Sequence, residues 1–140
     1  MKTLVVDTDV VSFIFNRHSL STPYLDIVAG NELVISFMTL AELRLGILQA
    51  NWGLRRRAQI EEYLERYGIY FPDEALCDAW AQVTLDARNS GRVISPQDAW
   101  IAATALELAA PLVTHNARDF EGVSGLRIQT VYIPPPRPTQ

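Results

Sequence analysis

Four acidic residues stand at comparable places in the chain and are the side chains best suited to chemistry. Each follows a predicted strand or lies near the start of a predicted helix; they are Asp7, Glu42, Asp98 and Asp119. Carboxylates gathered at one place repel one another unless a cation lies between them. Oxygen ligands of this kind suit Mg²⁺ or Mn²⁺, with water and substrate phosphates completing the coordination. The set therefore indicates a divalent-metal site, provided that the fold brings the acids together.

Each of these acids also has a purely structural explanation. Thr39–Glu42 and Ser95–Asp98 both match the capping box, in which an acid satisfies backbone N–H groups at the start of a helix. Asp7 is placed to cap the helix after its strand, and Asp119 is placed to close a turn. A single acid therefore decides little, and the argument for a site depends on all of them together.

Short apolar runs alternate with helical patterns and would position the acids. The expected strands cover residues 3–7, 33–36, 69–71, 111–114 and 126–133, and the expected helices cover residues 10–15, 21–30, 39–49, 54–66, 72–89 and 95–108. This alternation predicts an α/β fold with a mainly parallel central sheet of about five short strands, flanked by helices. Right-handed crossovers place the ends of parallel strands at one edge, where sites are built. The later acids are therefore expected to return to Asp7.

Length and composition favour one domain. The chain has 140 residues, of which 49% are hydrophobic, enough for an ordinary core. We expect residues 1–133 to form the domain and the proline-rich residues 134–140 to form a disordered or polyproline-like tail. No apolar run suggests a membrane span or a signal peptide. The single cysteine, Cys77, excludes an internal disulfide, suits the cytoplasm and is expected in the core.

The net charge of −4 argues against a protein that coats nucleic acid non-specifically, because such a protein would be basic. Bound divalent cations would offset this charge. An acidic chain thus stays compatible with a polyanionic substrate once metal is bound.

Four segments resemble, in order, the successive motifs of PIN-domain ribonucleases, and most closely those of VapC toxins from bacterial and archaeal toxin–antitoxin pairs. Their sequences are DTDV from Asp7, TLAELRLG from Thr39, DAWIAATA from Asp98 and THNARDF from Thr114. The resemblance extends from Asp7 to about Ile133. One departure is Asp9, where the family more often has Asn. This residue would add a metal ligand or keep the hydrogen bonds of the Asn, and both options stay open.

The resemblance implies metal-dependent cleavage of RNA phosphodiester bonds. The catalytic and metal-binding residues would be Asp7, Glu42, Asp98 and Asp119, holding one or two Mg²⁺ or Mn²⁺ ions. The residues that orient these carboxylates or a water would be Thr8, Asp9, Thr114 and Asn116. The implied partners are an RNA substrate, a cognate antitoxin that covers the active site, and a second copy of the chain in a homodimer, all in the cytoplasm.

Several arginines are candidates for contacts with RNA phosphates. They are Arg44, Arg55, Arg56, Arg57 and Arg118. Trp52, beside the run of three arginines, is placed to stack on a base. The alternative for that run is a solvated helix face paired with Glu61 and Glu62 at helical spacing.

Two other functions fit part of the sequence. The segment from Val5 to Val11 also resembles the strand-end motif of haloacid-dehalogenase-type phosphatases, with Asp7 as nucleophile. That family needs a lysine downstream, and the only lysine here is Lys2. A PIN-like module that binds RNA or protein without cutting is the other alternative, and the presence of all four acids argues against it.

Overall fold

The fold is built around a five-stranded sheet whose strands all run parallel. The computed structural model describes residues 1–131. The strands are β1 (Thr3–Val6), β2 (Glu32–Ser36), β3 (Gly68–Tyr70), β4 (Leu112–Val113) and β5 (Ile128–Gln129). Their order in the sheet is β3-β2-β1-β4-β5, so β1 lies at the centre. The predicted α/β class and parallel sheet are confirmed.

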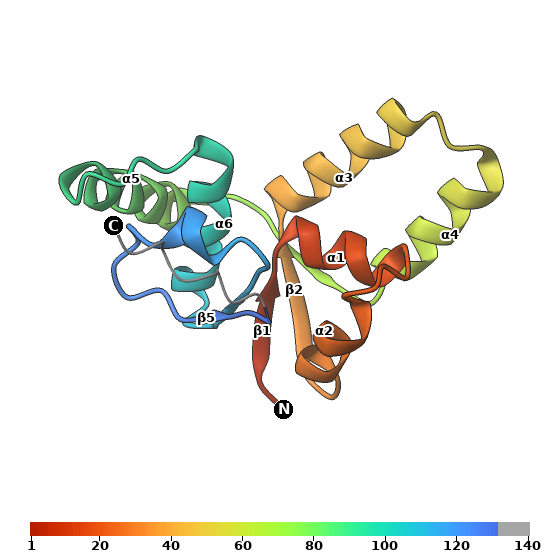
Figure 1. The fold of residues 1–140 in the computed structure, drawn as a ribbon. Helices are drawn as coiled ribbons and strands as arrows, with labels where there is room; N and C mark the ends of the chain where they lie inside the picture. The colour runs from red at the N-terminus through yellow and green to blue at the C-terminus, as the bar shows by residue number, and fades with distance from the viewer. Residues whose placement is uncertain (132–140) are drawn as a thin grey trace, which may run out of the picture.

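Helices cover both faces of this sheet (Figure 1). They are α1 (Thr8–Phe15), α2 (Ser21–Val28), α3 (Phe37–Ala50), α4 (Leu54–Leu64), α5 (Glu74–Asn89), α6 (Pro96–Glu107) and a short 3₁₀ helix, η1 (Ala117–Phe120). Successive side chains of β1 point to opposite faces. Leu4 and Val6 pack with side chains of α1 to α4, whereas Val5 packs with side chains of α5 and α6. The chain therefore has one apolar core on each face.

Helices α3 and α4 leave the body of the molecule as a two-helix arm (Figure 1). The turn between them begins at Asn51, whose left-handed backbone (φ 51°) ends α3. Three leucines of the arm are exposed: Leu45 by 54%, Leu48 by 66% and Leu54 by 87%. Because α3 starts directly after β2, the base of the arm lies at the edge of the sheet where β1 also ends.

Some boundaries differ from the sequence-based expectation. Helix α3 starts two residues before Thr39, because Ser36 caps it by accepting a hydrogen bond from the N–H of Met38 (3.1 Å). Within the described residues the last strand covers only Ile128–Gln129, because its neighbour β4 offers just Leu112 and Val113 for pairing. The part of the expected strand beyond residue 131, and the proposed tail at 134–140, lie outside the described residues.

The expectation that Cys77 lies in the core is wrong, because its side chain is exposed. The buried face of α5 consists of Leu76, Val83 and Ala87 at helical spacing, and Cys77 falls beside that face. In the part of the chain that the structure describes, no helix combines the length and the apolar character needed to cross a membrane.

Candidate active site

Asp7 lies where β1 ends and α1 begins, and only 6% of it is exposed. One carboxylate oxygen accepts a hydrogen bond from the N–H of Thr8 (2.8 Å), so Asp7 caps α1. The other oxygen accepts a hydrogen bond from the hydroxyl of Thr114 (2.7 Å), just after β4. The hydroxyl of Thr114 accepts in turn from the N–H of Asn116 (3.1 Å). Two strand ends therefore hold this carboxylate in one orientation.

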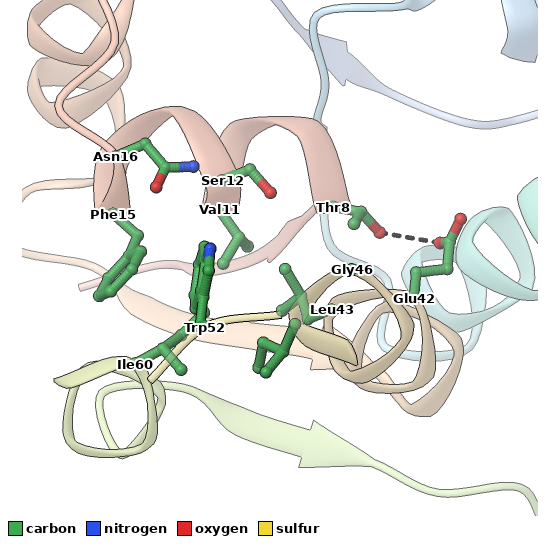
Figure 2. Close-up of a pocket in the computed structure, with 11 residues that line it drawn as sticks. Thr8, Val11, Ser12, Phe15, Asn16, Glu42, Leu43, Gly46, Trp52 and Ile60 are labelled. Atoms are coloured by element: carbon green, nitrogen blue, oxygen red, sulfur yellow. Dashed lines mark hydrogen bonds between the residues drawn. The ribbon is translucent and has the colours of Figure 1, made fainter. Parts of the chain in front are cut away.

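Glu42 reaches the same edge from the base of the arm. The hydroxyl of Thr8 donates to Glu42 Oε1 (2.9 Å; Figure 2). The same hydroxyl is hydrogen-bonded to the hydroxyl of Thr39 (3.0 Å). Thr39 is fully buried inside α3 and does not cap it, so the capping-box interpretation of Thr39–Glu42 is wrong. Glu42 is instead held by a residue of α1.

Asp9 links the start of α1 to the loop after β4. Its Oδ1 accepts from the N–H of Val10 (2.7 Å). Its Oδ2 accepts both from the N–H of His115 (3.1 Å) and from the side-chain amide of Asn116 (2.9 Å). Three N–H groups thus bind this carboxylate. Two of them belong to the loop after β4, so Asp9 connects the start of α1 to that loop.

Asp98 and Asp119 come from the second half of the chain. Asp98 lies in the first turn of α6, where Ser95 caps the helix by accepting from the N–H of Asp98 (3.1 Å). This part of the capping-box prediction is confirmed. Asp119 lies in η1, which follows β4. Both acids, together with Arg118 and Ser95, line one hollow of about 270 Å³.

The pKa values of Asp7 and Asp98 reflect their burial and the proximity of other acids. Burial first, and then the charges of Asp9 and Asp98, raise the pKa of Asp7 to about 7, although the hydrogen bonds from Thr114 and Thr8 act in the opposite direction. Burial also raises the pKa of Asp98 to about 6, with contributions from the charges of Asp119, Glu42 and Asp9. Asp7 and Asp98 are thus harder to ionise, first because they are buried and second because other carboxylates are near them.

The residues present fit a hard divalent cation in donor chemistry, but they do not form a closed cage. Among residues 1–131, no group of three or more His, Cys, Asp or Glu side chains is gathered tightly enough to hold a metal ion. Mg²⁺ needs no such cage, since it keeps several waters and shares substrate phosphates. The repulsion between the carboxylates is the feature that a cation would relieve.

Comparison with known proteins fixes the family. The model of the PIN domain matches residues 4–126. Ribonuclease VapC1 of Haemophilus influenzae strain R2866 is 33% identical over 128 residues, which cover 89% of this chain and 95% of that protein. The chain belongs to the VapC ribonucleases of the PIN-domain family. The alternative resemblance to haloacid-dehalogenase-type phosphatases is therefore wrong.

Two further relatives agree with this VapC assignment. The tRNA(fMet)-specific endonuclease VapC of Shigella flexneri is 29% identical over 129 residues, covering 92% of this chain and 98% of that protein. Among solved structures, VapBC-5 from Mycobacterium tuberculosis, a member of the VapBC family of toxin–antitoxin systems, superimposes with a TM-score of 0.66 at 26% identity. That match covers 94% of this chain and 98% of the other.

The candidate substrate-binding arginines of this VapC chain do not gather at one place. Arg118 lines the hollow that holds Asp98 and Asp119. Arg44 is exposed on the arm, where it forms an ion pair with Glu61. The predicted pairing of the three consecutive arginines with Glu61 and Glu62 is not observed, since the only ion pairs within residues 1–131 are Arg44–Glu61 and Arg92–Glu121.

Two of the three consecutive arginines, Arg56 and Arg57, contact Trp52 on the arm. The guanidinium carbon of Arg56 lies 4.4 Å from the centre of the Trp52 ring, and Arg57 Nε donates to the carbonyl of Trp52 (3.0 Å). Arg55 is exposed at the start of α4. The structure thus separates Arg118, beside the acids, from a basic cluster beside Trp52.

One residue that supports the site was missed from the sequence. Tyr24 of α2 is fully buried, and its hydroxyl lies 2.7 Å from His115 Nδ1 and 3.4 Å from Thr130 Oγ1. Tyr24 therefore holds His115, which lies in the loop after β4 that Asp9 also binds. A tyrosine at helical spacing looks like any core residue, and no signal in the sequence distinguishes it.

Proposed function

We propose that this VapC chain is an endoribonuclease that hydrolyses RNA phosphodiester bonds with a water activated at the acidic site. The observation that carries the proposal is the raised pKa of Asp7 and Asp98 among neighbouring carboxylates at the edge of the sheet. Accumulated negative charge of this kind serves a nuclease, because it attracts divalent cations, and the bound cations in turn attract a phosphate of the substrate. The names of the ribonuclease relatives support the same reaction.

The metal that we propose is Mg²⁺ or Mn²⁺, as one or two ions held by Asp7, Glu42, Asp98 and Asp119. When bound, such a cation lowers the pKa of a coordinated water and offsets charge on the phosphate. Carboxylate oxygens are the donors that these ions prefer. No side chain has to act as a nucleophile in this reaction.

The neighbouring residues keep the carboxylates in place. Thr114 and the N–H of Thr8 fix the two oxygens of Asp7, and the hydroxyl of Thr8 fixes Glu42. Asp9 and Asn116 hold together the two loops that carry Asp7 and Asp119. We assign Asp9 this anchoring role and not that of a ligand, since three N–H groups already occupy its oxygens. Arg118 is placed to contact a phosphate of the RNA.

The partners that we propose are an antitoxin and a second copy of the chain. The related VapBC-5 belongs to a family of toxin–antitoxin systems, which supports the antitoxin. The exposed leucines of the arm, Leu45, Leu48 and Leu54, offer apolar surface to a protein partner. Such a system would act in the cytoplasm, which the single unpaired Cys77 suits.

Cleavage of a mixed RNA pool by the purified, partner-free protein tests the proposal. The pool is incubated with Mg²⁺, with Mn²⁺ and with EDTA, and wild type is compared with Asp98→Asn. We expect cutting that requires metal and disappears in the variant. If wild type binds RNA but cuts nothing under any metal, the chain is the non-catalytic PIN-like module and the nuclease function is wrong.

A further inference from the structure

We propose that the pocket between α1 and the arm binds one nucleobase of the substrate strand, next to the phosphate that is cut. This inference rests on the ribonuclease function proposed above, and it names the part of the RNA that the protein holds.

The pocket begins at the acidic site and runs away from it. Its volume is about 190 Å³, and Thr8 and Glu42 line one end. The walls are mainly apolar side chains of α1, α3 and α4, namely Val11, Phe15, Leu43, Ile47 and Ile60. Sites for drug-sized ligands have roughly 300–1,000 Å³. The smaller volume here suits a single planar ring system.

Trp52 provides an aromatic wall on which a base can stack. In Figure 2 its ring stands between Phe15 on one side and Leu43, Gly46 and Glu42 on the other. The Phe15 ring lies 5.8 Å from it, and the guanidinium carbon of Arg56 lies 4.4 Å from its centre. These contacts fix the indole in place. Every nucleobase offers a flat face to such a ring.

Polar groups line the opposite rim of the pocket. Ser12 lies in α1, and Asn16 directly follows the helix and donates its N–H to the carbonyl of Ser12 (2.9 Å), so both residues lie on one side of it (Figure 2). Asn16 Oδ1 accepts a hydrogen bond from Arg56, which orients its amide. A hydroxyl and an amide at this position can bond the edge of an unstacked base, which is how sequence-specific proteins recognise single-stranded RNA.

The charges around the pocket favour RNA over an apolar side chain of a protein partner. Within the described part of the chain, Arg55, Arg56 and Arg57 form no ion pair with an acid, so their charges remain available to phosphates. The pocket also begins at Thr8 and Glu42, where the strand must pass to be cut. An apolar side chain would use the walls but neither the arginines nor the polar rim.

Gly46 allows the pocket to be filled without disturbing the fold. It lines the pocket from α3, and a Cβ built on it meets no heavy atom within 4 Å. Leucine also has a higher helix propensity than glycine. The test is therefore Gly46→Leu. The matched control is Gly53→Leu, because Gly53 also has open space around its Cβ and lies outside the pocket lining.

The assay uses a pool of randomised single-stranded oligoribonucleotides with Mg²⁺, and the ends of the products are sequenced. We expect wild type to prefer particular bases at one position beside the cut. Gly46→Leu should abolish the preference at that position and lower kcat/KM roughly tenfold or more, as the loss of one stacked base does. Gly53→Leu should keep both the preference and the rate. An unchanged cleavage profile and rate in Gly46→Leu would overturn the proposal.

Binding separates this inference from the nuclease function. Fluorescence anisotropy measures the affinity of the same pool for Asp98→Asn and for Asp98→Asn combined with Gly46→Leu. Weaker binding of the double variant supports the base pocket even if wild type cuts no RNA, in which case only the nuclease function fails. Equal binding rejects the pocket. If Gly46→Leu weakens binding of a co-expressed antitoxin and leaves RNA unaffected, the pocket takes a protein side chain and the base assignment is wrong.

Discussion

The hydroxyl of Thr8 donates to the carboxylate of Glu42 across 2.9 Å, although the two residues are 34 positions apart in the chain. This bond connects the first turn of α1, which Asp7 caps, with the base of the arm. Two of the proposed ligand carboxylates are therefore held by the same short segment.

Replacing Thr8 by valine keeps its shape and removes its hydroxyl. Glu42 then loses its hydrogen-bond donor, and we expect a roughly tenfold lower kcat and an unfolding free energy lower by about 1 kcal/mol. Cleavage kinetics and urea denaturation measure the two effects. Thr8→Ser keeps the hydroxyl and serves as the control; a loss of activity in Thr8→Ser equal to that in Thr8→Val would contradict the role of this bond.

The stability of the metal-free protein should fall as pH rises. Burial first, and neighbouring charge second, raise the pKa of Asp7 from 3.8 to about 7 and that of Asp98 to about 6. The folded state thus binds more protons than the unfolded state between pH 4 and 7, so stability declines over that range and levels off above it. Denaturation midpoints in EDTA at several pH values measure this decline. Asp98→Asn should flatten it below pH 6, and an unchanged slope would show that Asp98 is not responsible.

Metal should stabilise the folded protein at neutral pH. A ligand that binds only the folded state at a concentration of 100 times its Kd adds about 2.7 kcal/mol. We expect Mg²⁺ or Mn²⁺ to raise Tm and EDTA to reverse the rise. In Asp7→Asn the rise should be much smaller, because one ligand is weakened. An equal rise in this variant would place the metal elsewhere.

Substitution of Asp9 distinguishes an anchor from a ligand. In Asp9→Asn the side-chain oxygen can still accept from the N–H of His115 and from the amide of Asn116, so we expect cleavage within about threefold of wild type. Asp9→Ala removes these two bonds and the bond from the N–H of Val10, and we expect it to lower the unfolding free energy by about 1–3 kcal/mol and to slow cleavage. If Asp9→Asn is as inactive as Asp98→Asn, Asp9 is a metal ligand.

Patterns that depend on local chemistry were predicted well from the sequence. The apolar run before Asp7 is the central strand β1, and Ser95 caps α6 as expected. Asp7, after β1, and Asp119, in the 3₁₀ helix after β4, lie at one edge because adjacent parallel strands end there, a rule that needs only the order of the elements. The strand and the cap follow from residues a few positions apart.

Features that depend on packing between distant segments were not predicted. Thr39 matched a cap, but Ser36 starts the helix earlier and leaves Thr39 buried beside Thr8. The contact of Tyr24 with His115 joins residues 91 positions apart, and no local sequence pattern around either residue predicts it. The pocket beside Glu42 also depends on how the arm lies against α1.

The hydrogen bond between Thr114 and Asp7 spans 107 positions of the chain and has a consequence for synthesis. The ribosome makes Thr114 107 residues after Asp7, and Asp119 follows Thr114. A nascent chain that stops before β4 holds Asp7 without the hydroxyl that orients it and without the last acid. The proposed acidic site is therefore complete only after the segment that carries Thr114 and Asp119 has been made and has folded onto β1.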